Sequence, residues 1–327
     1  MELRTTFNIQ PSEQKITYSD KTIFIGSCFA TSIGHQFETG HLPVMINPAG
    51  TVYNPVSVLN TLETIAEGRK FGIEDLYNKN GTWISFNHST DFSSDDPDEL
   101  LVRINNISSE AAKFLNDCSI LFITFGTARV YRWKRTGTIV SNCHKIKASE
   151  FDQELLSVND IVTVWEKRLD KLQSLNPNLR VIFTISPVRH WKDGAHGNQV
   201  SKSVLFVAVE ELLDHKTRPG YFPAFELLMD DLRDYRYYDE DMLHPSGAAV
   251  SYIWEAFSKC YFDEDTWNLW NDISAVSKAV AHRIRKVSGE ETRRFAEKSI
   301  EKIESLCRKA PNINLETEKS YFRSLLS

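Results

Sequence analysis

The chain has 327 residues, of which 41% are hydrophobic and 25% charged, and its formal net charge is −6. This composition is typical of a soluble globular protein of one or two domains. Charges of both signs are mixed along the chain, which argues against a nucleic-acid-binding protein with a basic stripe. No apolar run predicts a membrane span, and residues 1–15 lack the core of a secretion signal, so we expect a cytoplasmic protein.

The cysteines predict neither a disulfide framework nor a zinc site, because their number is odd and no CxxC pair occurs. We therefore expect no metal, and no cofactor is needed for the chemistry considered below. Most free cysteines are small buried hydrophobic residues. Cys28 differs from the others because it closely follows a predicted strand. The five cysteines are Cys28, Cys118, Cys143, Cys260 and Cys307.

The first predicted strand, residues 22–25 (TIFI), ends at a glycine and runs into a predicted helix at residues 31–37. Ser27 and Cys28 occupy the turn between them. Such a turn lies at the carboxyl edge of a parallel sheet, where open α/β folds bind their ligands. Both residues are therefore candidate nucleophiles.

The next part of the chain contains a second predicted strand, residues 42–47 (LPVMIN), and a helix at residues 55–68. A long insertion covers about residues 48–117. The third strand, residues 118–125 (CSILFITF), is too apolar to be half exposed. Beyond it, residues 129–142 alternate around a glycine and predict a β-hairpin.

The second half of the chain continues the alternation of helical and strand patterns, and from residue 264 on it is charged and favours helix. The predicted elements are a helix at residues 159–175, a strand at residues 180–186 (RVIFTIS), helices at residues 202–213 and 224–232, a weaker strand at residues 234–241 (DYRYYDED) and a helix at residues 245–257.

This alternation predicts right-handed crossovers and a three-layer α/β/α sandwich. We expect one five-stranded parallel sheet in the flavodoxin-like order 2-1-3-4-5, with Cys28 and His244 at its carboxyl edge. This domain would occupy residues 1–263. Residues 264–327 would form a helical C-terminal extension packed on the core, not a second catalytic domain.

A second pattern, DMLHP, places Asp241 and His244 three residues apart, just before a helix that Pro245 opens. A carboxylate at this spacing can fix the tautomer of the imidazole and leave its other nitrogen free as a base. Taken alone, the pattern favours a simpler interpretation, a helix cap beside a surface histidine.

Together the two patterns resemble the SGNH/GDSL hydrolase superfamily, in which Gly-Asp-Ser opens the fold and Asp-x-x-His closes it. Residues 26–30 read GSCFA, the five letters after which the GSCFA family is named, and the chain is similar to that family from about residue 26 to residue 247. Other stretches share the resemblance: NPAGTVYNP from residue 47, FGTARVY from residue 125, NCHK from residue 142 and SPVRHWKDGAHGNQVSK from residue 186.

The resemblance implies a covalent mechanism. Cys28 stands where the superfamily has its nucleophilic serine, and Ser27 stands where it has aspartate. His244 would be general base and then general acid, and Asp241 would orient it. We expect the thiol of Cys28 to attack, because a helix start and a nearby imidazolium both lower the pKa of a thiol. Ser27 would instead hydrogen-bond the turn or the helix start.

The resemblance also implies an oxyanion hole made of the nucleophile's N–H, a glycine after the second strand and an asparagine after the third. Gly50 matches the glycine. Ala128 stands where the asparagine belongs, and the loss of one such donor costs about 10²–10³ in rate. Asn142 and Asn54 are candidates for the missing donor.

Residues 186–202, after the fourth strand, gather polar side chains where ligand-facing loops begin. They form either a solvated loop or a substrate contact, and anchors such as Trp191 favour the contact. Its main candidates are Arg189, His190 and Asn198. The two histidines of this stretch are six residues apart, which argues against a metal.

Two further histidines follow less clear patterns. His144 is equally a pocket residue or the end of a capped hairpin. His88 is expected to be structural.

These features predict an enzyme that hydrolyses an ester or thioester through a covalent acyl-enzyme, or transfers the acyl group to a sugar hydroxyl. Loops rich in Arg, His, Asn and Trp favour a small-molecule or carbohydrate-linked acyl ester as substrate. The missing asparagine favours an alternative, a catalytically impaired ligand-binding module on the same fold. A third interpretation is an assembly protein, which would lose its partner on deletion of residues 264–327.

Overall fold

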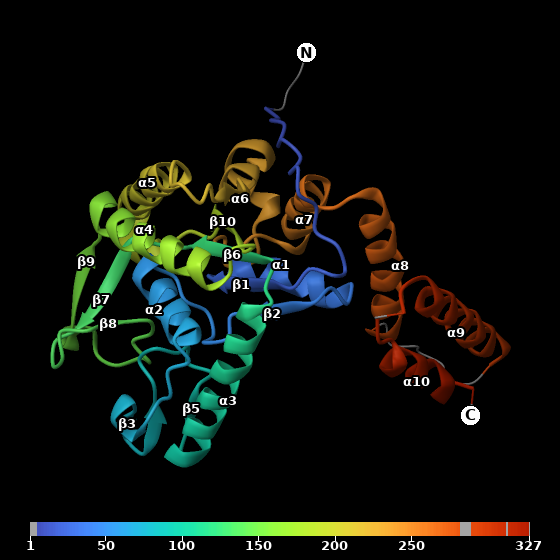
Figure 1. The fold of residues 1–327 in the computed structure, drawn as a ribbon, viewed down its shortest axis with the longest axis horizontal. Coiled ribbons are helices and arrows are strands. Elements are labelled where there is room, and N and C mark those ends of the chain that lie inside the picture. Colours follow the sequence, from blue (N-terminus) through green and yellow to red (C-terminus); the bar gives the residue numbers. More distant parts are fainter. Residues whose placement is uncertain (1–4, 282–288, 312, 327) are drawn as a thin grey trace. The chain divides into compact units, whose positions relative to one another are not determined.

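We describe the fold from a computed structural model, in which residues 5–281, 289–311 and 313–326 are described (Figure 1). The chain divides into two compact units. The sheet unit contains the N-terminal residues through Gln10, Asp20–Gly34 and Val44–Phe257. The helical unit contains Pro11–Ser19, His35–Pro43 and Ser258–Ser327. Two segments near the N-terminus, which we expected in the first domain, thus belong to the same unit as the C-terminal helices.

The sheet unit is built around one five-stranded parallel sheet with the order β2-β1-β6-β10-β11. Its register places Gly26 of β1 and Thr184 of β10 opposite Thr124 of β6. The predicted order is confirmed, and the first four predicted strands are found with small shifts at their ends. The strands are β1 (Thr22–Gly26), β2 (Val44–Ile46), β6 (Ile120–Phe125), β10 (Arg180–Ile185) and β11 (Gly220–Tyr221).

The fifth predicted strand is wrong. Residues 234–241 contain a short 3₁₀ turn, Tyr235–Tyr237, and an isolated bridge from Tyr238 to Pro245. The fifth strand is β11, which pairs with Ile182 and Phe183 of β10. The aromatic run suggests a half-buried strand, but the side chain of Tyr235 is 79% exposed. β11 was missed because a two-residue strand beside a proline has no apolar run to mark it.

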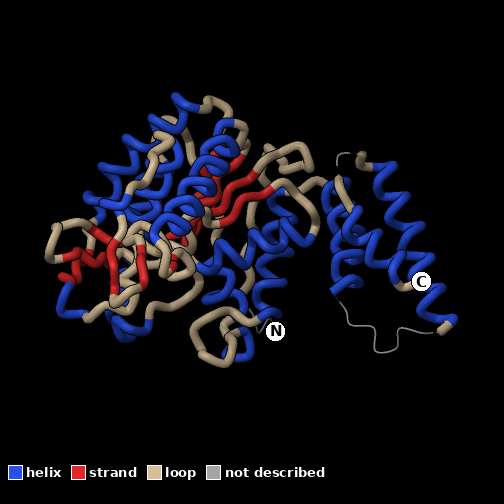
Figure 2. The backbone as a smooth tube through the Cα atoms, turned by 90° about the horizontal axis from the view of Figure 1, so that it is seen from below, coloured by secondary structure: helices blue, strands red, loops and turns tan. Residues whose placement is uncertain are grey.

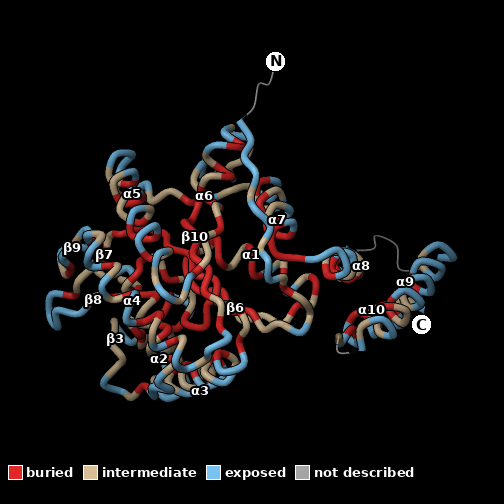
Figure 3. Tube along the Cα trace, turned by 45° about the horizontal axis from the view of Figure 1, so that its top comes forward, coloured by how far each residue is buried: buried red, intermediate tan, exposed pale blue. Residues whose placement is uncertain are grey.

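One face of the sheet carries the main hydrophobic core. Side chains that alternate along β1, β6 and β10, such as Ile25, Ile123 and Phe183, pack here against Trp165. Figure 3 shows these central strands as buried. The helices that contribute buried side chains to this core are α2 (Pro55–Ala66), α3 (Pro97–Asn116), α4 (Val158–Leu175), α5 (Gly194–Leu213) and α6 (Ala224–Glu226).

The opposite face is aromatic. The rings of Phe24 and Phe122 stack with centroids 4.9 Å apart. The rings of Phe122 and Phe222 pack against that of Phe257 in α7 (Gly247–Tyr261), with ring centroids 5.0 and 5.3 Å apart. Helices therefore cover both faces, as Figure 2 also shows, and the predicted three-layer α/β/α sandwich is confirmed.

Two helical elements after β10 frame the candidate site. α5 begins at Gly194, eight residues before the start that we predicted at residue 202. The prediction missed this part of the helix because its first two turns bury polar rather than apolar side chains. The helix predicted at residues 224–232 is present as α6 (Ala224–Glu226) followed by a π-helical turn, Leu227–Leu232.

The insertion contains more regular structure than we predicted. It includes α2, α3 and a small antiparallel sheet of β3 (Tyr77–Lys79), β4 (Thr82–Ile84) and β5 (Ser93–Ser94). The predicted hairpin is present as β7 (Arg129–Trp133) and β8 (Ile139–Val140). A strand that we did not predict, β9 (Phe151–Leu155), pairs with the other edge of β7.

The helical unit has a hydrophobic core of its own, formed by α8 (Glu264–Ala281), α9 (Glu290–Lys309) and α10 (Glu316–Ser324). Its N-terminal segments are tied to the C-terminal part. The N–H of Ile16 donates to the carbonyl oxygen of Tyr261, and the indole of Trp270 donates to the carbonyl oxygen of Gln36. None of the helices in the described part of the chain has the length and hydrophobicity to cross a membrane.

Candidate active site

The turn between β1 and α1 (Cys28–Thr39) requires Gly26. Its φ is +146°, and a Cβ atom there would lie 2.2 Å from the carbonyl oxygen of Thr124. Ser27 is buried, and its Oγ accepts a hydrogen bond from the N–H of Phe29 at 3.3 Å. Ser27 therefore caps the helix start, as predicted, and Cys28 is the first residue of the helix.

Two opposing effects act on the Cys28 thiol, which is partly exposed. Burial raises its pKa above the ordinary value, whereas its own N–H, the N–H of Phe29 and the charge of Lys202 lower it. The helix start thus favours the thiolate as we expected, but the net direction is upward, so the expected overall lowering is wrong. The cation that acts on Cys28 is Lys202.

Asp241 and His244 form the predicted hydrogen bond. Oδ2 of Asp241 lies 2.5 Å from Nδ1 of His244, and Oδ1 accepts the N–H groups of Leu243 and His244 at 2.9 Å. These hydrogen bonds, that from the His244 N–H first, lower the pKa of Asp241 to about 2. Asp241 is thus both a cap of the turn and the partner that orients the imidazole, which leaves Nε2 of His244 for a second contact.

Electrostatic coupling identifies the neighbours of these groups. The carboxylate of Asp241 raises the pKa of Cys28, and His244 lowers the pKa of His190. Asp241 thus lies close enough to Cys28, and His244 close enough to His190, for their charges to affect these pKa values, as expected for residues at one edge of a parallel sheet.

The segment after β10 is a structured support. It contains a 3₁₀ turn, Trp191–Asp193, before α5 begins. Oδ1 of Asn198 accepts the N–H of His190 at 2.9 Å, and the His190 ring packs edge-on against Tyr53 at 5.5 Å. Burial and the charge of Lys202 lower the pKa of His190 to about 4, so this ring is neutral at pH 7.

The first half of α5 buries a polar face that we did not predict. Asn198, Ser201 and Lys202 are each at most 1% exposed. Oγ of Ser201 accepts the N–H of Ala128 at 2.7 Å, and Nζ of Lys202 donates to the carbonyl oxygen of Ser186 at 2.6 Å. The signal was present: the buried stripe of α5 at Leu205, Ala208, Val209 and Leu212 extends backwards at helical spacing onto these three residues.

A cleft of about 520 Å³ opens beside Asp241. Arg189 lines this cleft, and its Nε is buried and has no hydrogen-bond partner among the described residues. Apolar and aromatic side chains make up most of the wall. The lining residues are Arg189, Trp191, Leu228, Met229, Arg233, Asp234, Tyr235, Tyr238, Asp241, Met242 and Leu243.

The predicted oxyanion donors have other hydrogen-bond roles. The N–H of Gly50 donates to the carbonyl oxygen of Asn47 at 2.7 Å. Asn54 caps α2 through Oδ1, which accepts the N–H of Ser57. The preceding residue, Tyr53, lies at the sheet edge, because its carbonyl oxygen accepts the N–H groups of Gly126 and Thr127.

Asn142, His144 and His88 belong to the framework of the insertion and hairpin. Oδ1 of Asn142 accepts the N–H of His144. Nε2 of the buried His144 lies 2.8 and 3.1 Å from the carbonyl oxygens of Ser85 and His88. This geometry favours the capped hairpin end over the pocket residue. His88 is buried against Phe71 and its Nδ1 contacts Oγ of Ser85, consistent with a structural residue.

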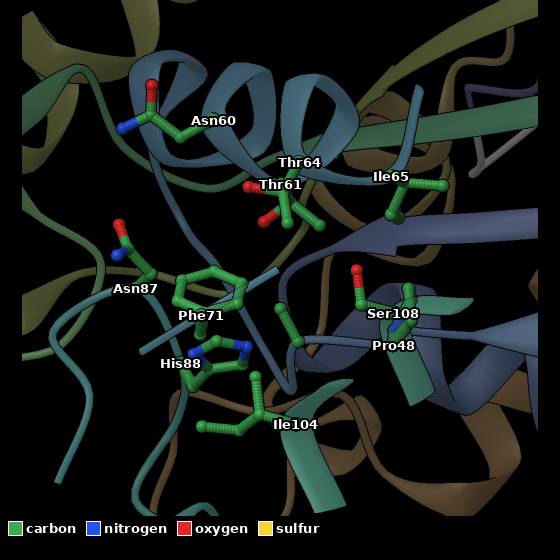
Figure 4. A pocket seen from close by; sticks show the side chains of 11 residues that line it. Pro48, Asn60, Thr61, Thr64, Ile65, Phe71, Asn87, His88, Ile104 and Ser108 are labelled. Atoms are coloured by element: carbon green, nitrogen blue, oxygen red, sulfur yellow. The ribbon is translucent and has the colours of Figure 1, made fainter. Parts of the chain in front are cut away.

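A second cavity, shown in Figure 4, is enclosed by α2, α3 and the loop of His88. Its volume is about 20 Å³, close to the space that one water molecule requires. It therefore cannot hold an acyl substrate. Among the described residues, no cluster of three or more His, Cys, Asp or Glu side chains could hold a metal ion.

Two family models match the chain. The model of the GSCFA family matches residues 21–257, and that of the GSCFA domain protein, C-terminal domain, matches residues 273–327. The first match covers well over half of the chain and includes every residue of the candidate site. No curated protein matches the chain.

Proposed function

Because this chain belongs to the GSCFA family, we propose that the edge of its sheet carries out the acyl chemistry of SGNH hydrolases. The reaction is hydrolysis of an ester or thioester, or transfer of its acyl group to a sugar hydroxyl. One observation supports this proposal above the others: Nδ1 of His244 lies 2.5 Å from Oδ2 of Asp241, which leaves Nε2 free, and Cys28 opens α1 just after β1.

The mechanism has two halves. Nε2 of His244 takes the proton of the Cys28 thiol as Sγ attacks the acyl carbonyl, and then gives this proton to the leaving alcohol or thiol. The acyl group is then held as a thioester on Cys28. A water molecule or sugar hydroxyl attacks this thioester and gives its proton to Nε2 of His244, which passes it to Sγ as the acid or the new ester leaves. Asp241 remains ionised and holds the tautomer throughout.

Two donors stabilise the oxyanion in this proposal, and the resemblance implies only the first of them. The N–H of Cys28 lies at the helix start, where negative charge is favoured. Nδ2 of Asn198 is buried and has no acceptor among the described residues, and we propose it as the second donor. We assign Asn198 to the position left by Ala128.

The cleft beside Asp241 is the binding site in this proposal. Its aromatic wall, with Trp191 51% and Tyr235 79% exposed, suits the apolar face of a sugar or an acyl chain. Arg189 offers a hydrogen bond to a polar or anionic group of the substrate. These features support a polar acyl ester as the substrate.

A panel of p-nitrophenyl esters from acetate to octanoate tests the proposal. We expect release of p-nitrophenolate by the purified protein, and a burst that reflects acyl-enzyme formation. His244→Ala should remove the activity. Absence of release with every ester, or the same rate after His244→Ala, would refute the hydrolase.

One observation favours the alternative of a binding module. The N–H of Gly50 is engaged in a protein hydrogen bond, and Ala128 has no side-chain amide to offer in place of the implied asparagine. A module of this kind would bind a non-hydrolysable acyl amide but would release no p-nitrophenolate from the esters, and it would show no burst. The same ester panel, followed by binding of the amide, separates the two functions.

Arg189→Met is expected to raise KM roughly tenfold or more for substrates with an anionic or carbohydrate group, because a hydrogen bond to a charged group contributes about 1.5–3 kcal/mol. We expect kcat to change less, since Arg189 binds ground state and transition state alike. The matched control is Arg293→Met, which replaces an exposed arginine of α9 that pairs with Glu297, because neither of these residues lines the cleft. Equal KM values for Arg189→Met and wild type would remove Arg189 from the binding site.

A further inference from the structure

A third cavity of the sheet unit is larger than the cleft beside Asp241. Its volume is about 700 Å³, within the range that is typical of ligand sites, and it shares no lining residue with that cleft. It is formed by one face of α2, the segment around β3 and the β7–β8 hairpin, which can be located in Figure 1. We call this cavity the α2 groove. It is a separate candidate binding site, to which the proposed mechanism gives no role.

The charged side chains that line the α2 groove are almost all paired. Of these side chains, Glu74 alone has no ion-pair partner among the described residues. A charge that already has a partner offers little to a ligand ion of either sign, so the charge of the wall favours a neutral ligand. The pairs are Arg69 with Asp75, Arg132 with Glu154, Glu63 with Arg168 and Glu67 with Lys171.

Two side-chain amides of the α2 groove are available for hydrogen bonds. Asn60 of α2 and Asn87 of the loop after β4 both line the groove, and neither side chain bonds to another described residue. In Figure 4 both amides extend to the same side, to the left of Phe71. An amide donates through its NH₂ group and accepts through its oxygen. The pair therefore suits a ligand whose groups both donate and accept, as hydroxyl groups do.

A buried hydroxyl adds to this polar site. The α2 groove continues into the small cavity of Figure 4, with which it shares Asn60, Thr64 and Asn87. Ser108, which is 8% exposed, lines that cavity, and its Oγ is buried without a hydrogen-bond partner among the described residues. Such a hydroxyl is costly unless something bonds to it. The small cavity has room for one water molecule, which would bridge Ser108 to a ligand in the groove.

Aromatic rings form the apolar part of the wall. The ring centroid of Trp133 lies 5.5 Å from that of Tyr77 and 4.7 Å from that of Phe86, and all three residues line the α2 groove. Trp133 is buried, whereas Tyr77 and Phe86 are half-buried and so keep part of their surface accessible. The groove thus combines a rigid apolar surface with polar groups placed opposite each other across its length.

We propose that the α2 groove binds a neutral oligosaccharide. Hydroxyl groups of the sugar bond to the amides of Asn60 and Asn87, and its apolar C–H face packs against Tyr77 and Phe86. A ligand of this class has many groups that both donate and accept, an apolar face and no charge, and these are the three properties that the wall requires. The proposal goes beyond the proposed function and does not depend on it, because the two cavities have no lining residue in common.

Isothermal titration calorimetry with maltotriose, cellotriose and triacetylchitotriose tests the proposal. We expect at least one of these sugars to bind with a Kd of about 1 mM or lower. The double variant Asn60→Ala/Asn87→Ala should weaken binding about tenfold or more, because each amide that is lost removes hydrogen bonds to the ligand. Asn178→Ala, which removes an exposed amide outside the groove, should leave binding unchanged.

A second variant addresses the groove as a whole. Thr138→Trp places a large ring in the α2 groove from an exposed position and should abolish binding. Thermal unfolding confirms the fold of each variant. Retention of binding in both the double variant and Thr138→Trp would overturn the proposal, as would loss in Arg189→Met with retention in the double variant, which would place the sugar in the cleft beside Asp241.

The chemical class of the ligand has its own test. Trigalacturonate carries negative charges and the trimer of glucosamine carries positive ones, so we expect both to bind at least about tenfold more weakly than the best neutral trisaccharide. Tighter binding of either charged sugar, or no binding of any neutral probe at about 10 mM, would refute the proposal. None of these measurements requires turnover. A protein that binds the sugar but hydrolyses no ester would keep the α2 groove as a binding site and reject the hydrolase.

Discussion

Cys28→Ala is expected to reduce kcat for p-nitrophenyl esters by about four orders of magnitude or more, because removal of a nucleophile leaves only binding and oxyanion stabilisation. Ser27→Ala should weaken turnover only in part, since Ser27 caps the helix on which Cys28 stands and accepts the N–H of Phe29. The measurement is steady-state kinetics on both variants, with thermal unfolding to confirm the fold.

The remaining cysteines supply the controls. Burial raises the pKa of Cys118 to about 12 and that of Cys143 to about 11, and no positive charge outweighs it. Iodoacetamide should therefore label Cys28 faster than either, and Cys143→Ala should retain full activity. Full activity in Cys28→Ala together with loss in Ser27→Ala would reassign the nucleophile to the hydroxyl.

Asp241→Asn is expected to lower kcat by about 10⁴ while the fold is retained, because an amide can hold His244 in the wrong tautomer. The carboxylate has a pKa of about 2, below its ordinary 3.8, so it is ionised throughout the range in which an esterase is assayed. Asp241 therefore does not contribute to the acid limb of the rate profile. The measurement is the pH–rate profile of the wild type and of Asp241→Asn, which gives both the loss of kcat and the position of the acid limb.

The same pKa has a consequence for stability with a definite sign. A carboxylate with a lowered pKa in the folded state stabilises the fold at pH values above 3.8, and this contribution is lost as the pH falls toward 2. Asp241→Asn should remove that part of the acid sensitivity. Its matched control is Asp96→Asn, because Asp96 also accepts two backbone N–H groups, those of Asp98 and Glu99, but holds no histidine. Asp96→Asn should alter stability alone; an equal loss of activity in both variants would make Asp241 a cap and nothing more.

The parts of the fold that are predictable from the sequence are the strands whose side chains are buried on both faces of the sheet along nearly their whole length. β6 and β10 are apolar over nearly their whole length because helices cover both faces, and no other element in a soluble protein requires that pattern. The two ends of the site, Cys28 and the pair of Asp241 and His244, are predictable because each motif combines a turn with a chemically distinctive side chain.

The remainder depends on contacts between distant residues. β11 forms because β10 offers it a free edge, which its own two residues do not indicate. Lys202 is buried because Nζ donates to the carbonyl oxygen of Ser186 and lies near the ring of Phe225, and a lysine in a polar stretch is otherwise expected on the surface. The hydrogen bond from the N–H of Gly50 to the carbonyl oxygen of Asn47 likewise depends on a turn that only the folded structure reveals.

The composition of the helical unit affects how the chain can fold during synthesis. Ile16 and Phe37 are fully buried, and their partners Tyr261 and Phe262 belong to the C-terminal part of the chain. A ribosome adds about 5–20 residues per second, so the two early segments wait roughly 10–50 seconds for the partners that cover them. We therefore expect a nascent chain to leave Ile16 and Phe37 without these partners until Tyr261 and Phe262 emerge, and a chain truncated before residue 258 to lack the partners permanently.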